Sequence, residues 1–125
     1  MIPVHQTTFG EGKGNCFQAA LASVFELPLE EVPNFCVDYG DDWYHETSVW
    51  LGEKYGLWLI RVGVGAPSPK GYHLISGLSP REGVRHSVVG LNGTPVHDPH
   101  PSGDGLAEEQ TYDLFVSRVE APKEK

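Results

Sequence analysis

The sequence changes character near its middle, from helix-like periodicity to short strand-like segments. Residues 16–27 repeat apolar side chains at helical spacing, and residues 42–55 carry a second amphipathic pattern that ends at Gly56. Five short segments rich in aliphatic and β-branched residues follow, separated by Gly, Pro and Asn: 57–62, 72–76, 85–91, 94–97 and 111–119. Helices followed by strands favour an α+β domain over a βαβ repeat, so we expect an N-terminal helix packed on an antiparallel sheet.

The helix predicted at residues 16–27 has clear signals at both ends. Asn15 is a good N-cap, and Gln18, three residues later, can complete a capping box with it. Pro28 cannot continue the helix, and residues 29–32 are predicted to add one further helical turn. Cys16 therefore falls in the first turn of the predicted helix.

Length and charge restrict the classes of protein to which this chain can belong. Its 125 residues, 39% of them hydrophobic, support one core, so we predict a single domain at residues 1–121 and a disordered charged tail at 122–125. The net charge of -8 repels a phosphate backbone and the Lys and Arg residues are scattered, which argues against nucleic acid as a partner. No apolar run approaches the roughly 20 residues that span a bilayer, and the first residues do not resemble a signal peptide. We expect a cytoplasmic protein with no membrane partner.

Two cysteines, Cys16 and Cys36, are too few for a disulfide framework and do not form a CxxC pair. A thiol attacks a carbonyl carbon as the thiolate, which the free N–H groups and the dipole at a helix start stabilise. Cys16 has this position, with small neighbours at Gly14, Ala19 and Ala20 that would leave room for a substrate backbone. It is thus a candidate nucleophile, the alternative being a small buried hydrophobic residue. Cys36 is predicted to lie between two loops in a structural role.

The segment HSVVGLNGTPVHDPHP supplies a candidate base, His86, and a candidate orienting residue, Asp98, on two predicted strands. If the loop between the strands has three residues, 91–93, His86 and Asp98 face each other on one side of the hairpin. If it has only Asn92 and Gly93, His97 shares the face of His86 instead. We favour the three-residue loop.

Attack on a carbonyl also requires hydrogen-bond donors for the developing oxyanion. The backbone N–H of Cys16 is one candidate, and Gln6 is a second, because the glycines between them can fold Gln6 back over the helix start. The alternative for Gln6 is an ordinary surface amide. His73 is a second possible base, which ranks below His86 because no hairpin places an aspartate beside it.

Other patterns give weaker signals. A metal site built from His86, His97, Asp98 and His100 is disfavoured, because neighbouring strand residues point to opposite faces and no HExxH pattern is present, and no cofactor is expected. The glycines of GEGKGN do not match a phosphate-binding loop and are interpreted as a flexible lead-in to the helix. Of the tryptophans, Trp50 and Trp58 are predicted to be core residues, and Trp43 is a candidate for a substrate cleft.

Gln6, the helix opening GNCFQAALASVFELP and the HSVV...HDPHP hairpin together resemble the papain-like cysteine peptidase superfamily, in particular its small bacterial and phage branches related to the C39 peptidases. The resemblance extends from residue 6 to residue 119. It implies that Cys16 is the nucleophile, His86 the general base, Asp98 the orienting residue and Gln6 the oxyanion donor. The spacing from Gln6 to Cys16 is longer than is usual in that superfamily, whose fold also serves amidases, deamidases, transferases and inactive binding proteins.

The leading hypothesis is a cysteine-dependent hydrolase that cleaves an amide bond through a thioacyl intermediate, with a peptide, a protein or a small amide as substrate. A non-catalytic binding protein with the same fold is the main alternative. A transferase or deamidase that uses the same three residues is the third possibility, since water access and the shape of the cleft decide the acceptor.

Overall fold

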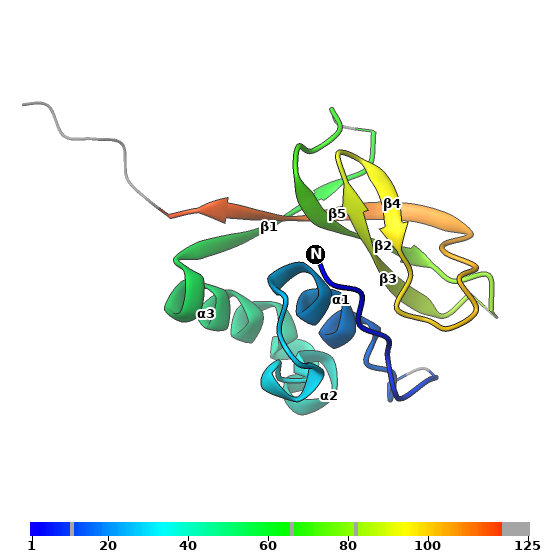
Figure 1. Cartoon of the computed structure of the whole chain (residues 1–125), viewed down its shortest axis with the longest axis horizontal. Helices are drawn as coiled ribbons and strands as arrows, with labels where there is room; N and C mark the ends of the chain where they lie inside the picture. The colour runs from blue at the N-terminus through cyan, green and yellow to red at the C-terminus, as the bar shows by residue number, and fades with distance from the viewer. Residues whose placement is uncertain (11, 66, 82, 119–125) are drawn as a thin grey trace, which may run out of the picture.

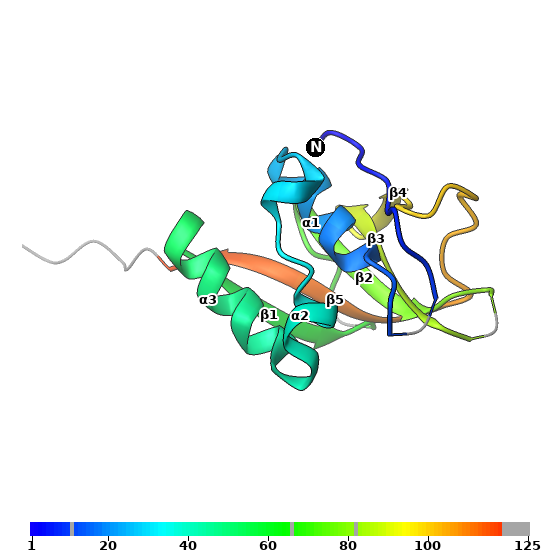
Figure 2. The same ribbon diagram turned by 90° about the horizontal axis from the view of Figure 1, so that it is seen from below.

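The computed structural model describes residues 1–10, 12–65, 67–81 and 83–118. In this part of the chain, three α-helices cover one face of a five-stranded antiparallel sheet, which confirms the predicted α+β class (Figures 1 and 2). The predicted tail at residues 122–125 and the predicted strand end at Val119 lie outside the described residues. None of the described helices combines the length and the apolar character needed to cross a membrane.

The first helix, α1, spans Cys16–Phe25, so it ends two residues before the predicted boundary. Glu26 adopts a left-handed conformation with φ of 58° and terminates the helix ahead of Pro28. Asn15 occupies the N-cap position but makes no capping hydrogen bond, so the predicted capping box is wrong. Its Oδ1 instead accepts the N–H groups of Thr7 and Thr8, and this fastens the N-terminal segment to the start of α1.

The remaining helical elements are short except for one. A 3-10 turn at Leu29–Glu31 agrees with the predicted helical turn, and α3 spans Trp43–Tyr55, one residue from its predicted start. Gly56 closes α3 with φ of 67°, a left-handed conformation that glycine adopts without strain. Helix α2, at Phe35–Tyr39, was not predicted; a second 3-10 turn at Gly40–Asp42 joins it to α3.

The sheet contains every strand that the sequence predicts. Its strands are paired in the order β1-β5-β2-β3-β4, and all neighbours run antiparallel. Strands β2 and β5 each extend beyond their predicted limits, to Leu78 and back to Glu108. The bounds of the strands are β1 Leu57–Gly63, β2 Tyr72–Leu78, β3 Arg85–Leu91, β4 Thr94–His97 and β5 Glu108–Ser117.

The hairpin between β3 and β4 has a two-residue turn, so the expected three-residue loop is wrong. Leu91 pairs with Thr94, which leaves only Asn92 and Gly93 in the turn. Both have positive φ, 53° and 87°, as a type I′ turn requires. This turn matches the twist of the flanking strands, and Asn-Gly is the dipeptide that adopts it most readily.

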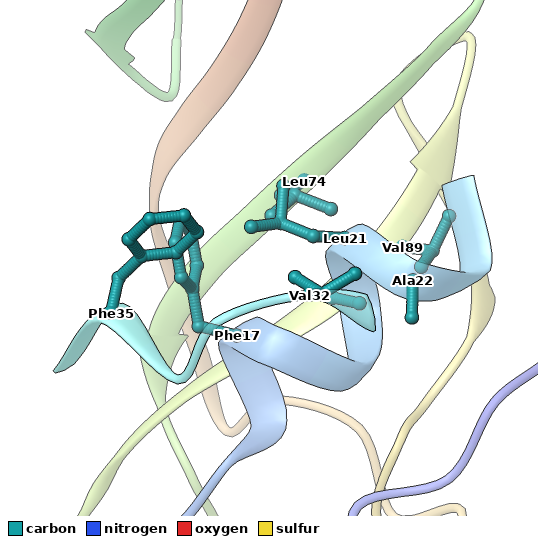
Figure 3. Close-up of a cluster of buried hydrophobic side chains, with 8 residues drawn as sticks. Phe17, Leu21, Ala22, Val32, Phe35, Leu74 and Val89 are labelled. Carbon is teal, nitrogen blue, oxygen red and sulfur yellow. The ribbon is translucent and has the colours of Figure 1, made fainter. Parts of the chain in front are cut away.

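The main core lies between α1 and the sheet (Figure 3). Phe17 and Leu21 of α1 face Leu74 of β2 and Val89 of β3, while Val32 and Phe35 close the cluster from the segment after α1. Burying side chains of this size stabilises the fold by about 1.5–3 kcal/mol each. The same packing fixes the position of α1 against β2 and β3.

Two sequence expectations about burial are wrong. Ala19 and Ala20 are fully buried between α1 and the sheet, so they do not form a path for a substrate backbone. Trp58 is 49% exposed, with the guanidinium of Arg118 stacked 3.7 Å from its ring centroid. Strand β1 lies at the edge of the sheet, where one face of Trp58 meets solvent. Trp50 packs against the main core as predicted.

Candidate active site

Cys16 is the first residue of α1 and is half-buried. Its backbone N–H belongs to the first turn of the helix, where N–H groups have no intrahelical acceptor. The rest of α1 is anchored by the core beneath it, and the preceding segment is anchored by Asn15. The thiol is therefore presented by a rigid helix start with free donors and a favourable dipole around it.

His86 and Asp98 form a close, buried pair. The Nε2 atom of His86 lies 2.6 Å from Oδ1 of Asp98, and their side chains are 4% and 8% exposed. The carboxylate also accepts hydrogen bonds from the backbone N–H groups of His100, at 2.9 Å, and Gly105, at 2.8 Å. Because Nε2 faces Asp98, the other ring nitrogen, Nδ1, remains for a second partner.

A β-bulge explains why Asp98 reaches His86 in spite of the two-residue turn. The register of the hairpin shifts after Gly90, which pairs with Pro95, so that Val89 pairs with His97 and Val96 is an extra residue. Continuing the shifted register places Asp98 on the same side of the hairpin as His86. Pro95 has no N–H to donate to a ladder, and proline in sheets is confined to edges and bulges such as this one.

The electrostatics of the pair favour an imidazolium next to a carboxylate. Burial alone would lower the pKa of His86, but the hydrogen bond to Asp98 and the neighbouring Cys16 side chain raise it from 6.5 to about 9. Burial alone would raise the pKa of Asp98, but the hydrogen bonds from His86, His100 and Gly105 lower it to about 2. At neutral pH, His86 is therefore protonated between a carboxylate and the sulfur of Cys16.

Two cavities meet at Cys16 and His86. The larger, of about 310 Å³, extends toward Trp43 and Arg61, and the smaller, of about 220 Å³, extends toward Gln6 and His100. Six residues line both cavities: Gly10, Gly14, Cys16, Val84, Arg85 and His86. The sulfur of Cys16 and the imidazole of His86 therefore lie between the two cavities. A substrate that extends to both sides of the reacting bond needs space on both sides of these groups.

Gln6 is placed in the smaller cavity, together with Cys16 and His86. It is 7% exposed and therefore not an ordinary surface amide. Its Nε2 donates to the carbonyl of Thr8 at 2.9 Å, and its backbone N–H donates to the carbonyl of Pro99 at 3.0 Å. Its Oε1 is buried without a hydrogen-bond partner among the described residues. Gln6 thus lies close to Cys16 at the start of α1, as the glycines between them in the sequence predicted.

Cys36 lies in the first turn of α2 and lines the larger cavity with Cys16, so its predicted place between two loops is wrong. It is exposed as a residue, but desolvation of its thiol and the neighbouring charge of Cys16 raise its pKa from 9.0 to about 11. Cys36 is therefore a thiol at neutral pH, next to a cysteine in a different environment. The sequence contained no signal for this neighbourhood, because α2 was not predicted.

Arg61 and Asp113 form an ion pair in the wall of the larger cavity that the sequence did not indicate. Nε and Nη2 of Arg61 donate to the two carboxylate oxygens at 2.7 and 2.9 Å, and Asp113 is fully buried. The guanidinium lies 4.9 Å from the ring centroid of Trp43, the candidate cleft residue of the sequence, which lines this cavity. Ser76 and Ser87, bonded to each other at 2.7 Å, complete this wall.

His73 and His97 lie outside both cavities. His73 is 1% exposed, packs against Tyr112 and lines neither cavity. Nε2 of His97 bonds the carbonyl of Val4 at 2.8 Å, which separates it from His86. No group of three or more His, Cys, Asp or Glu in the described ranges is arranged to hold a metal ion.

Comparisons of this chain with models of protein families, with curated proteins and with solved structures found no match.

Proposed function

We propose that the protein is a cysteine-dependent hydrolase that cleaves an amide bond through a thioacyl intermediate on Cys16. The observation that carries the proposal is the 2.6 Å bond between His86 and Asp98, made by the histidine whose ring also interacts with the Cys16 side chain. A nucleophile, a base and a group that orients the base are the three parts of this chemistry. We assign the fold, on the same grounds, to the papain-like type related to the C39 peptidases.

The acylation step requires Cys16 as the thiolate and His86 as the imidazolium. Sγ of Cys16, as thiolate, forms a bond to the carbonyl carbon, and the π electrons of the C=O bond move to oxygen. The backbone N–H of Cys16 and the side-chain amide of Gln6 are the donors assigned to this oxyanion. When the intermediate collapses, the C–N bond breaks and the imidazolium of His86 gives its proton to the leaving amine. A thioester and a neutral His86 remain.

The deacylation step reverses these roles. Neutral His86 takes a proton from water, whose oxygen forms a bond to the thioester carbon. The C–S bond then breaks, the acid is released, and the thiolate and imidazolium are restored. Asp98 keeps Nε2 of His86 engaged in both steps, so that Nδ1 faces the reacting atoms.

Labelling by iodoacetamide at pH 7, followed by mass spectrometry of peptides, tests the proposal. With a pKa of about 11, only about one Cys36 thiol in ten thousand is ionised at this pH, so Cys36 is an internal control in the same cavity. We expect Cys16 to react at least 100-fold faster than Cys36, and His86→Ala to slow Cys16 by more than about tenfold. His45→Ala, at an exposed position of α3, should change neither rate.

Acylation by the p-nitrophenyl ester of an N-acetyl amino acid tests the covalent step. We expect an acyl adduct on Cys16 alone. Water should then remove this adduct in the wild type, but only slowly in His86→Ala. Equal labelling of the two cysteines, with no effect of His86→Ala, would overturn the hydrolase assignment and leave a binding protein as the better interpretation.

A further inference from the structure

The two cavities beside Cys16 differ in charge from the protein as a whole. The chain has 17 acidic and 9 basic residues, yet three of its four arginines, Arg61, Arg81 and Arg85, line the two cavities. Among the described residues that line them, none is an aspartate or a glutamate. A positive recess in a negative surface discriminates between ligands by charge, since low-dielectric walls concentrate its field.

The three arginines differ in how far their charge is compensated. Arg61 is paired with the buried carboxylate of Asp113, and Arg81 lies 3.8 Å from Asp104. Arg85 has no carboxylate within ion-pair distance in the described ranges; its Nη1 bonds the neutral Oε1 of Gln110 at 2.6 Å. Arg85 also lines both cavities and directly precedes His86. Among the described residues, Arg85 is therefore the arginine of the cleft without a carboxylate partner.

Arg61 adds a fixed donor to the same space. Its Nε and Nη2 are committed to Asp113 and its Cζ lies over the ring of Trp43, so the guanidinium has little freedom to move. Its Nη1 has no acceptor among the described residues and remains able to donate. A planar acceptor such as a carboxylate suits a guanidinium held in this way, and little conformational entropy is lost when it binds.

The other walls of the larger cavity indicate which kind of chemical group bears the carboxylate that would bind there. Phe17, Val37, Trp43 and Val84 supply apolar and aromatic surface, while Gly10, Gly12 and Gly14 form a side-chain-free wall beside Cys16. A short aliphatic stem that ends in a carboxylate fits such a space, with the stem on the apolar wall and the charge at the arginines. Within amide substrates, this describes an acidic amino-acid residue.

From these observations we infer that the larger cavity is a substrate subsite for a carboxylate, with Arg85 as the residue that determines charge specificity and Arg61 as a fixed second donor. The inference rests on the proposed function, because it names the class of amide that the site accepts. The carboxylate is either the side chain of an acidic residue or the α-carboxylate at the end of a peptide.

Titration of ¹⁵N-labelled full-length protein by NMR tests this inference with no need for turnover. The Cys16→Ser variant is used so that hydrolysis cannot deplete the probes, which are N-acetylglutamate α-amide, N-acetylglutamine and N-acetylglutamine α-amide. The first has only a side-chain carboxylate, the second only an α-carboxylate, and the third is neutral. We expect at least one acidic probe to bind about tenfold more tightly than the neutral probe, and the tighter of the two identifies the source of the carboxylate.

Charge variants assign the preference to its residue. Arg85→Gln should abolish the preference for the acidic probe and Arg85→Lys should restore most of it, whereas Lys70→Gln, which removes an exposed charge outside both cavities, should leave it intact. Equal affinity for acidic and neutral probes, or a preference that survives Arg85→Gln, would overturn the inference. The proposed function fails on a different readout, the labelling of Cys16, so the two failures are distinguishable.

Discussion

The imidazole of His86 and the carboxylate of Asp98 meet at 2.6 Å across a hairpin whose two-residue turn would, without a bulge, place them on opposite faces. The extra residue, Val96, changes the parity of β4 and returns Asp98 to the face of His86. In this sequence, the pairing of His86 with Asp98 therefore requires that Val96 be accommodated as a bulge, and Val96 is an exposed residue of the edge strand that lines neither cavity.

Deleting Val96 is expected to leave the pair intact. In the shifted register, Val89 already pairs with His97, so removal of the bulged residue closes the ladder without moving Asp98. Inserting one alanine after Val96 should have the opposite effect, because it shifts Asp98 by one position and turns it to the other face. The pKa of His86, followed by NMR, should stay near 9 in the deletion variant and fall toward 6.5 in the insertion variant.

The insertion variant needs a check on its fold, which the amide spectrum of the core strands β2 and β5 provides. If the deletion lowers the pKa of His86 as much as the insertion does, then the bulge itself, rather than the parity of the strand, holds Asp98 in place.

The pH dependence of turnover should report the charge on His86. Because leaving-group protonation needs the imidazolium, acylation by an amide substrate should fall as pH rises through about 9. Asp98→Asn removes the negative partner, so this alkaline limb should move to lower pH, and acylation at pH 7.5 should fall by about 100-fold.

Asp104→Asn is the matched control for this prediction, since Asp104 is an exposed carboxylate in the same loop that lines neither cavity. An alkaline limb that stays in place in Asp98→Asn would show that Asp98 does not set the protonation of His86.

Local sequence signals were sufficient to predict much of this fold. The turn residues between strands and the apolar stripe of α1 act over a few residues, and the bounds of β3 and β4 agree with the prediction. Helix α2 was missed because its five residues carry too little periodicity, and its position depends on burial of Phe35 in the core. The hairpin register was missed because a bulge is decided by pairing with a neighbouring strand.

The candidate site was predictable only where its chemistry is local. A cysteine at a helix start can be recognised from the sequence, as Cys16 was. His86 and Asp98 were expected to meet across a three-residue loop, whereas the structure brings them together through a two-residue turn and a bulge. Arg61 and Asp113 are separated by 52 positions and lie on neighbouring strands, so no local pattern connects them. Cys36 joins the cavity only through the placement of α2.

The stability of the fold should depend on pH through the pair of His86 and Asp98. The folded-state pKa of His86 is raised, so its contribution is fully present below about pH 6.5 and is lost as pH rises through about 9. The pKa of Asp98 is lowered, so its contribution is present above about pH 3.8 and is lost as pH falls through about 2. In urea unfolding, the free energy of unfolding should differ most between wild type and Asp98→Asn from about pH 4 to 6.5. A difference in free energy that stays constant up to pH 10 would contradict this linkage.

Removing one partner of the ion pair between Arg61 and Asp113 should lower the free energy of unfolding strongly, whereas replacing both partners should lower it only slightly. Arg61→Met leaves a fully buried carboxylate without its cation, with only a 3.4 Å contact from Ser76, and should lower the free energy of unfolding by about 3–5 kcal/mol. Asp113→Leu should cost less, because Arg61 is 28% exposed and its guanidinium can return to water. The double variant should recover most of the loss, since an apolar pair of similar volume removes both charges. Urea unfolding of the wild type, the two single variants and the double variant forms a double-mutant cycle, which measures the coupling free energy between Arg61 and Asp113. If the loss of free energy in the double variant equals the sum of the losses in the single variants, the ion pair contributes no interaction of its own.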